Sequence, residues 1–248
     1  AVTAKQRGHE VILLEKSGVL GGKLNFSRQV PFKRDLCKFM DYLIHMVEKT
    51  GVEVRLNTEA TAELVESLEP DAVIAAVGAK ALVPPIPGVD GANVITAEEA
   101  YRKIKAGEDI GQRIAVLGGG DVGCETAVYL AQEAGKTVSL VEMTDTLAAA
   151  SCAIPRTAIT KEIEKCVDAH TGSRCTGITK DGITYVDATG EHSIQADTVV
   201  LSAGMVPQKE QAEAFRMIAG EFFPIGDCVK ANNVRTAVRT GYDSAIQL

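Results

Sequence analysis

The sequence predicts an α/β protein made of two doubly wound domains, one of them inserted into the other. Strand-like and helix-like segments alternate along the 248 residues, which is the pattern of parallel sheets covered by helices. A proline-rich stretch separates two such βαβ-like groups, and a strand and a helix return near the end of the chain. We therefore expect residues 1–107 and 206–248 to form one domain, and residues 108–205 to form the inserted second domain.

The first domain opens with a helix and a buried strand. Residues 1–7 are typical of the last two turns of a helix that Gly8 ends, and residues 9–15 form an apolar run that closes on an acid. A chain does not normally begin inside a helix, so we expect a fragment of a longer protein. The elements expected next are a helix at 35–50, a strand at 52–56 and a fully buried strand at 71–77.

The stretch 81–91 holds three prolines and two glycines, so we expect a linker without regular structure. A short helix is expected at 97–105. In the inserted domain, the expected elements are a strand at 112–117, a helix at 122–134, a strand at 137–142 and a β-meander over 178–187 and 191–201. A strand at 222–225 and a helix at 233–248 complete the first domain.

Composition and charge narrow the functional classes. The formal net charge is −7 and no run of five Lys or Arg occurs, so neither a nucleic acid nor an anionic membrane is expected as a partner. No apolar stretch approaches the roughly 20 residues that span a bilayer. The six cysteines include no C-x-x-C or C-x-x-x-x-C pair, and the four histidines include no pair at helical spacing. We expect free thiols, a reducing cytoplasmic location and no metal site.

Residues 112–142 carry a motif that predicts a dinucleotide-binding site. A buried strand enters the spacing Gly118-x-Gly120-x-x-Gly123, a helix leaves it, and the next strand ends in Glu142. The three glycines alone are weak evidence, but the strand, helix and acid around them make the motif specific. The first glycine allows the sharp turn, the second lets the backbone approach a pyrophosphate, and the third lets the helix pack close to the strand. The helix N-terminus then offers N–H groups and a positive dipole end to the phosphates.

Glu142 distinguishes between the two nicotinamide cofactors. A carboxylate at this strand end accepts hydrogen bonds from the ribose hydroxyls and repels a 2′-phosphate. No Arg or Lys follows it in residues 143–146. The sequence therefore favours NAD(H) over NADP(H). The alternative interpretation is a tight turn followed by a surface glutamate.

A second, incomplete site is indicated in the first domain. The strand at 9–15 ends in Glu15, where the adenosine ribose of a dinucleotide would lie, but no strand with a G-x-G-x-x-G loop precedes it. Gly226 and Asp227 stand between a strand and a helix, where a carboxylate can hold a sugar-alcohol hydroxyl. The N-terminus of that helix near Asn233 can stabilise negative charge on a reduced flavin ring. Asp227 could equally be an ordinary loop residue.

Five segments in order resemble the two-dinucleotide-fold pyridine-nucleotide flavoproteins. Within them, the chain is most similar to the C-terminal half of NADH:flavin oxidoreductases related to 2,4-dienoyl-CoA reductase and trimethylamine dehydrogenase. The resemblance covers residues 1–248 and rests on the segments ILLEKSGVLGGKL, AAVGAKALVPPIPG, VLGGGDVGCETA, VVLSAGMVPQ and FPIGDC. It implies an α/β fold of two nested Rossmann-like dinucleotide-binding domains, the first lacking its initial strand and glycine loop.

The resemblance also implies a role for each matching residue. The residues expected to bind NADH are Gly118, Gly120, Asp121, Val122, Gly123 and Glu142, with Glu125 beside the nicotinamide and Gly204 where the chain leaves the NAD domain. The residues expected near FAD are Glu15, Lys16, Gly21, Gly22, Lys23, Leu24, Gly78, Gly226 and Asp227.

The function expected is that of an electron-input module of an oxidoreductase. NADH would reduce FAD, and the electrons would pass to FMN and an iron–sulfur cluster in a TIM-barrel domain that is absent from this chain. Hydride transfer needs positioned cofactors, so we assign no acid–base catalytic residue. The alternative is a nucleotide-binding module that holds ADP or NAD as a structural group without catalysis.

Three departures from the resembled proteins qualify this expectation. Without the upstream glycine loop, FAD binding loses several charge-assisted hydrogen bonds, so we expect the isolated chain to be nearly colourless. No redox disulfide spacing or C-terminal dimerisation domain follows the motifs. A sheet edge left open by the missing strand could drive formation of a homo-oligomer. The sequence names neither the final electron acceptor nor the substrate.

Overall fold

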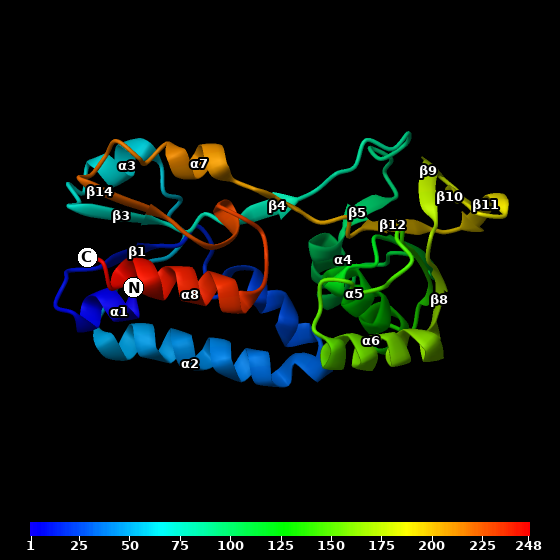
Figure 1. Cartoon of the computed structure of the whole chain (residues 1–248), viewed down its shortest axis with the longest axis horizontal. Coiled ribbons are helices and arrows are strands. Elements are labelled where there is room, and N and C mark those ends of the chain that lie inside the picture. The colour runs from blue at the N-terminus through cyan, green and yellow to red at the C-terminus, as the bar shows by residue number, and fades with distance from the viewer. The chain divides into compact units, whose positions relative to one another are not determined.

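A computed structural model describes residues 1–248, and the chain divides into two compact units (Figure 1). Unit 1 contains Ala1–Lys80 and Met205–Leu248, and unit 2 contains Ala81–Gly204. The domain boundary expected at residue 108 is therefore corrected to residue 81. The reason is that strand β5 (Val94–Thr96) and helix α4 (Ala97–Lys105) pack with the strands of unit 2.

Unit 2 is built on a five-stranded sheet in the order β5-β12-β6-β7-β8, and every neighbouring pair in it is parallel. Its remaining elements are β6 (Arg113–Leu117), α5 (Asp121–Gln132), β7 (Thr137–Val141), α6 (Ala153–Cys166), β8 (Val167–His170) and β12 (Thr198–Leu201). All of β12, and β6 beyond its first residue, are buried. Such continuous burial is typical of parallel strands that are covered on both faces.

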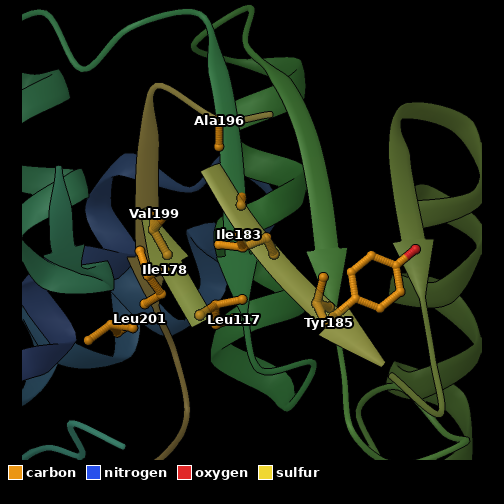
Figure 2. Packing of buried hydrophobic residues seen from close by; sticks show 9 residues of the cluster. Leu117, Ile178, Ile183, Tyr185, Ala196, Val199 and Leu201 are labelled. Carbon is orange, nitrogen blue, oxygen red and sulfur yellow. The ribbon is translucent and has the colours of Figure 1, made fainter. Parts of the chain in front are cut away.

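A three-stranded antiparallel sheet packs against β6 and β12. Its strands are β9 (Arg174–Thr179), β10 (Gly182–Asp187) and β11 (Gly190–Gln195). Figure 2 shows Ile178, Ile183 and Ala196 meeting Val199 and Leu201 in one hydrophobic cluster. This cluster is the core of unit 2 on the side away from α5.

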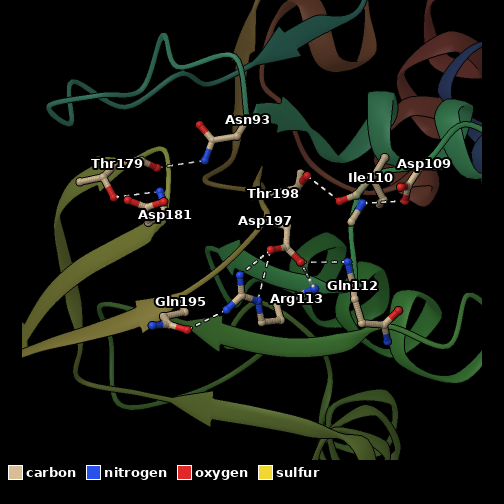
Figure 3. Close-up of polar contacts among 11 residues, drawn as sticks. Asn93, Asp109, Ile110, Gln112, Arg113, Thr179, Asp181, Gln195, Asp197 and Thr198 are labelled. Atoms are coloured by element: carbon tan, nitrogen blue, oxygen red, sulfur yellow. Dashed lines mark hydrogen bonds and ion pairs between the residues drawn. The ribbon is translucent and has the colours of Figure 1, made fainter.

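The expected strand 191–201 is two strands with different partners. β11 ends at Gln195 in the antiparallel sheet, and β12 begins at Thr198 in the parallel sheet. Asp197 causes the change of direction, because its carboxylate accepts hydrogen bonds from the backbone N–H groups of Gln112 and Arg113 at 3.0 and 2.8 Å (Figure 3). The Arg113 guanidinium donates to the same carboxylate at 2.6 Å. These hydrogen bonds hold the residue before β12 beside the first residue of β6.

The stretch predicted as a linker lacks regular structure but is packed against β9. Ile178 N–H donates to the Pro87 carbonyl at 2.8 Å. A Cβ on Gly88 would lie 1.9 Å from the Ile178 carbonyl oxygen, so only glycine allows this approach. The stretch beyond Ala81 thus has no helix or strand, as expected, and it is packed onto unit 2.

Unit 1 holds its strands in separate pairs. β1 (Ile12–Leu14) pairs in parallel with β2 (Glu53–Arg55), and β3 (Ala72–Ala75) pairs in parallel with β14 (Glu221–Pro224). A third pair joins β4 (Ala79–Ala81) and β13 (Met205–Pro207). No strand of the first pair is hydrogen-bonded to a strand of the second pair. Unlike the central strands of unit 2, β1 and β14 are only partly buried.

Helices lie on both sides of these strands. They are α1 (Val2–Gln6), α2 (Arg34–Thr50), α3 (Ala62–Glu66), α7 (Lys209–Glu213) and α8 (Val234–Ala245), with short 3₁₀ helices η1 (Gly22–Gln29), η2 (Pro31–Lys33) and η3 (Gly226–Cys228). Figure 1 shows α1, α2 and α8 together on one side and α3 and α7 on the other. The predicted α/β class is confirmed. None of the helices has the length and apolar character needed to cross a lipid bilayer.

Candidate dinucleotide-binding site

The three motif glycines form a tight corner between β6 and α5, as their spacing predicts. Gly118 has φ +106°, and a Cβ there would lie 2.4 Å from the Ser202 carbonyl oxygen. A Cβ on Gly123 would lie 1.8 Å from the Gly118 carbonyl oxygen. Both positions exclude a larger residue because the backbone of the same unit is too close.

Gly120 differs from these two glycines, because packing does not explain it. Its backbone is in the ordinary extended region, with φ −67° and ψ −177°, and a Cβ there would meet nothing within 4 Å. Gly120 is also the N-cap of α5, and no side chain caps this helix. Gly120, Asp121 and Val122 are exposed, so the start of α5 has free space and no side-chain cap, which is the arrangement that binds phosphate groups.

The Glu142 carboxylate lies directly beside this glycine corner. Its Oε2 accepts a hydrogen bond from Gly119 N–H at 2.6 Å. Its Oε1 accepts from the backbone N–H and the hydroxyl of Thr144, both at 2.8 Å. The acid at the end of β7 thus contacts the glycine loop itself. One hydrogen bond joins this carboxylate to the glycine loop, and two join it to Thr144.

The segment after β7 is tied to both sides of the corner. Ala148 N–H donates to the Gly119 carbonyl at 2.8 Å, and the Ser151 hydroxyl donates to Asp121 Oδ1 at 2.7 Å. Sequence reasoning missed Gly119, Thr144 and Ser151, because contacts between loops leave no spacing signal. Thr144 could have been suspected from its position two residues after the acid.

The buried face of α5 contributes to packing and not to a reactive centre. Cys124 is fully buried, and burial raises the pKa of its thiol to about 11. Thr126 lies against the Tyr101 hydroxyl, and burial raises the pKa of that phenol. Glu125 is half-buried in the first turns of α5. Gly204, with φ +115°, accepts a hydrogen bond from Leu82 N–H at 2.9 Å in the last position of unit 2.

In unit 1, the predicted residues of the second site lie around the ends of β1 and β14. Glu15 follows β1 directly, and its carboxylate accepts a hydrogen bond from Ser17 N–H at 2.7 Å. Gly21 and Gly22 have φ +115° and +53° and turn the chain into η1, where Leu24 is half-buried.

Lys23 is influenced electrostatically by Lys16, seven residues before it, and by Asp227 near the other end of the chain. Burial lowers the pKa of Lys23, the neighbouring Lys16 ammonium lowers it further, and the Asp227 carboxylate opposes both. Asp227 also accepts a hydrogen bond from Asn232 N–H at 3.2 Å.

Three further hydrogen bonds surround the second site. Gly226, with φ +63°, donates its N–H to the Thr240 hydroxyl at 3.1 Å. The N-terminus of α8 is capped by the Asn233 side chain, which accepts from Thr236 N–H at 3.0 Å. Gly78, with φ +75°, accepts from Gln208 N–H at 3.1 Å. No G-x-G-x-x-G spacing occurs in unit 1.

Perturbed groups elsewhere in unit 2 are structural. The guanidinium of Arg113, with the backbone bonds described above, holds the pKa of the Asp197 carboxyl well below its usual range. This pair lies at the amino ends of β6 and β12, the edge opposite to the glycine corner. Ligands of open parallel sheets bind at the carboxyl ends. All six cysteines are free thiols, and no three His, Cys, Asp or Glu side chains are grouped to hold a metal ion.

Comparisons with known proteins agree with this geometry. Bilirubin reductase of Mediterraneibacter gnavus is 35% identical over 247 residues, covering 99% of this chain and 38% of that protein. NADH oxidase of Thermoanaerobacter brockii is 35% identical over 253 residues, covering 100% of this chain and 39% of that protein. A solved structure of 2-naphthoyl-CoA reductase superposes with a TM-score of 0.93 at 28% identity, covering 100% of this chain and 37% of that one.

The chain thus spans about 38% of the length of the curated relatives that it matches. The family model described as pyridine nucleotide-disulphide oxidoreductase matches residues 1–241. The resemblance drawn from the five sequence segments is confirmed, and the chain belongs to the pyridine nucleotide-disulphide oxidoreductase family.

Proposed function

We propose that this chain is the electron-input module of a larger oxidoreductase. It would bind NADH in unit 2 and pass a hydride to FAD held in unit 1. The observation that supports the proposal most directly is the Glu142 carboxylate bonded to Gly119 N–H at 2.6 Å, beside the open backbone of Gly120. The similar proteins bear the names bilirubin reductase and NADH oxidase, which describe reactions that consume or transfer reducing equivalents.

In unit 2, the residues at the corner fit a nicotinamide dinucleotide. The N–H groups of Gly120, Asp121, Val122 and Gly123 would hold the pyrophosphate, because the first turn of α5 has no side-chain cap. Glu142 would accept hydrogen bonds from the ribose hydroxyls and would repel a 2′-phosphate. NADH would therefore be the preferred cofactor. Glu125 and Gly204 would lie toward the nicotinamide end, as the family resemblance implies.

In unit 1, the residues fit only part of an FAD site. Glu15 would hold the adenosine ribose, and Asp227 would hold the ribityl chain. Lys16 and Lys23 would lie near the anionic pyrophosphate. The remaining contacts would come from the backbone of Gly21, Gly22, Leu24, Gly78 and Gly226. No glycine loop in unit 1 is available for the pyrophosphate, so FAD would bind weakly to the isolated chain.

When both cofactors are bound, hydride would pass from nicotinamide C4 to flavin N5. The chain contributes position and electrostatics, and we assign no residue to proton transfer. The further proposal is that a partner domain with FMN and an iron–sulfur cluster receives the electrons. The six free thiols favour a reducing, cytoplasmic location.

A second candidate function is a nucleotide-binding module without catalysis. One observation favours it: unit 1 has no glycine corner like that of unit 2. In that case ADP or NAD would bind at Gly120 and Glu142 as a structural group.

The test is an anaerobic titration of the purified chain, first with NADH and NADPH alone and then with excess FAD present. Saturable NADH binding, followed by loss of the FAD absorbance near 450 nm at a rate above that of free FAD with NADH, supports the electron-input function. NADH binding without any rate enhancement supports the binding module. Tighter binding of NADPH would contradict the role given to Glu142.

A further inference from the structure

Asp121 presents an electrostatic problem at the proposed pyrophosphate site. Its side chain is exposed in the first turn of α5, where the helix N-terminus would receive a doubly charged group. Asp121 is the first helical residue, directly after the N-cap Gly120, and no side chain caps α5. A carboxylate left free there would repel the phosphates that the N–H groups attract.

The structure shows what holds this carboxylate. The Ser151 hydroxyl donates to Asp121 Oδ1 at 2.7 Å. Ser151 belongs to the segment between β7 and α6, which follows the glycine corner and α5 in the sequence. Its bond therefore directs the Asp121 carboxylate toward that segment and away from the N–H groups of α5.

Two hydrogen bonds fix the backbone of Ser151. Its N–H donates to the Ala148 carbonyl at 2.9 Å, and its carbonyl accepts from Arg156 Nη2 at 3.2 Å. Ala148 N–H in turn donates to the Gly119 carbonyl at 2.8 Å, which anchors the segment to the glycine corner. The hydroxyl thus has a defined place from which to donate.

We propose that Ser151 is a positioning residue for dinucleotide binding, which keeps the Asp121 carboxylate out of the pyrophosphate site. This inference rests on the proposed binding of NADH in unit 2 and adds to it. Without the Ser151 hydroxyl, the carboxylate is free to turn toward the phosphates or to cap the α5 N–H groups. Either movement opposes the pyrophosphate, and the opposition depends on the negative charge of Asp121.

The test compares dissociation constants of NADH, ADP and adenosine for the whole chain and its variants. For Ser151→Ala we expect binding of NADH and ADP to weaken about fivefold to tenfold, which corresponds to about 1 kcal/mol, while adenosine binding stays unchanged. Asp121→Asn removes the repulsion and is expected to bind NADH more tightly than the natural chain. The double variant Ser151→Ala/Asp121→Asn should match Asp121→Asn.

Salt and a matched control separate this role from general loss of structure. The Ser151→Ala defect should shrink as ionic strength rises, because exposed charges are screened. Ser67→Ala, which removes another exposed hydroxyl bond of 2.7 Å to the Leu64 carbonyl, should leave all three dissociation constants unchanged. Unaltered NADH binding by Ser151→Ala would overturn the inference. So would a double variant as weak as Ser151→Ala. A natural chain that binds neither NADH nor ADP would instead overturn the proposed function.

Discussion

Replacing Gly120 by alanine separates binding from folding at the glycine corner. Gly120 has extended backbone angles that alanine adopts freely, and a Cβ there meets no protein atom within 4 Å. The change from glycine stabilises the chain by about 0.4–1 kcal/mol through the unfolded state. Loss of a favourable N-cap residue costs a similar amount. The two effects offset each other, so we expect the thermal midpoint to move by less than about 4 °C.

The same Cβ would stand where the pyrophosphate approaches the backbone. If it removes two charge-assisted hydrogen bonds of about 1.5–3 kcal/mol each, NADH binding weakens by about 3–6 kcal/mol. That is a loss of at least about a hundredfold in affinity. The assay is a fluorescence titration of NADH together with a circular-dichroism melt of the same sample.

Two other glycines provide the comparison. Gly118→Ala should destabilise by more than about 3 kcal/mol, because φ is +106° and the Cβ would lie 2.4 Å from the Ser202 carbonyl oxygen. Gly220→Ala should leave NADH binding unchanged and raise stability by about 0.4–1 kcal/mol, since the nearest neighbour of its Cβ would be the Asp71 carbonyl oxygen at 3.8 Å. The reasoning fails if Gly120→Ala binds NADH as the natural chain does, or melts as early as Gly118→Ala.

Three further outcomes are expected. Glu142→Gln should weaken NADH binding at least tenfold, and adding Met143→Arg should shift the preference toward NADPH, both measured by titration of the two cofactors. Arg113 lowers the pKa of the Asp197 carboxyl in the folded chain. The ionised carboxylate therefore stabilises the fold above its ordinary pKa of about 4, and this stabilisation is lost as the pH falls toward the lowered pKa. Urea midpoints should therefore drop more for the natural chain than for Asp197→Asn between pH 5 and 3, and parallel curves would contradict this. With a thiol reagent at pH 8, exposed Cys152 should react rapidly, whereas Cys124, whose pKa is about 11, should react only on unfolding; rapid labelling of both would refute the assigned burial.

Much of the fold could be predicted where local signals were strong. The helix at 97–105 was expected with the bounds that the structure has, because Thr96 and Glu99 form a capping box at its start. The strands β6 and β7 were apolar runs within one residue of their observed ends. Helix α6 was missed because it has Pro155 in its first turn and an Ile154 side chain that is 85% exposed. Such a helix depends on tertiary contacts more than on its own pattern.

The limits of prediction are clearest where distant segments meet. The run 191–201 looks continuous in sequence, and only the bonds of Asp197 to Gln112 and Arg113 divide it. The glycine corner and Glu142 were predicted from spacing, because each glycine has a separate steric reason. The contacts from Thr144 and Ser151 were not, since they depend on how a loop closes over the corner. For the second site, the sequence indicated Lys23 and Asp227, but not that they share one electrostatic environment.

The paired strands of unit 1 have a consequence for how the chain opens to solvent. β1 and β14 each hydrogen-bond to one neighbour and are partly exposed, whereas β12 is buried between two neighbours. Amide hydrogens of unit 1 should therefore exchange with deuterium well before those of β6 and β12, through local opening that leaves unit 2 intact. The glycine corner of unit 2 would then stay formed while the strand ends of unit 1 open transiently.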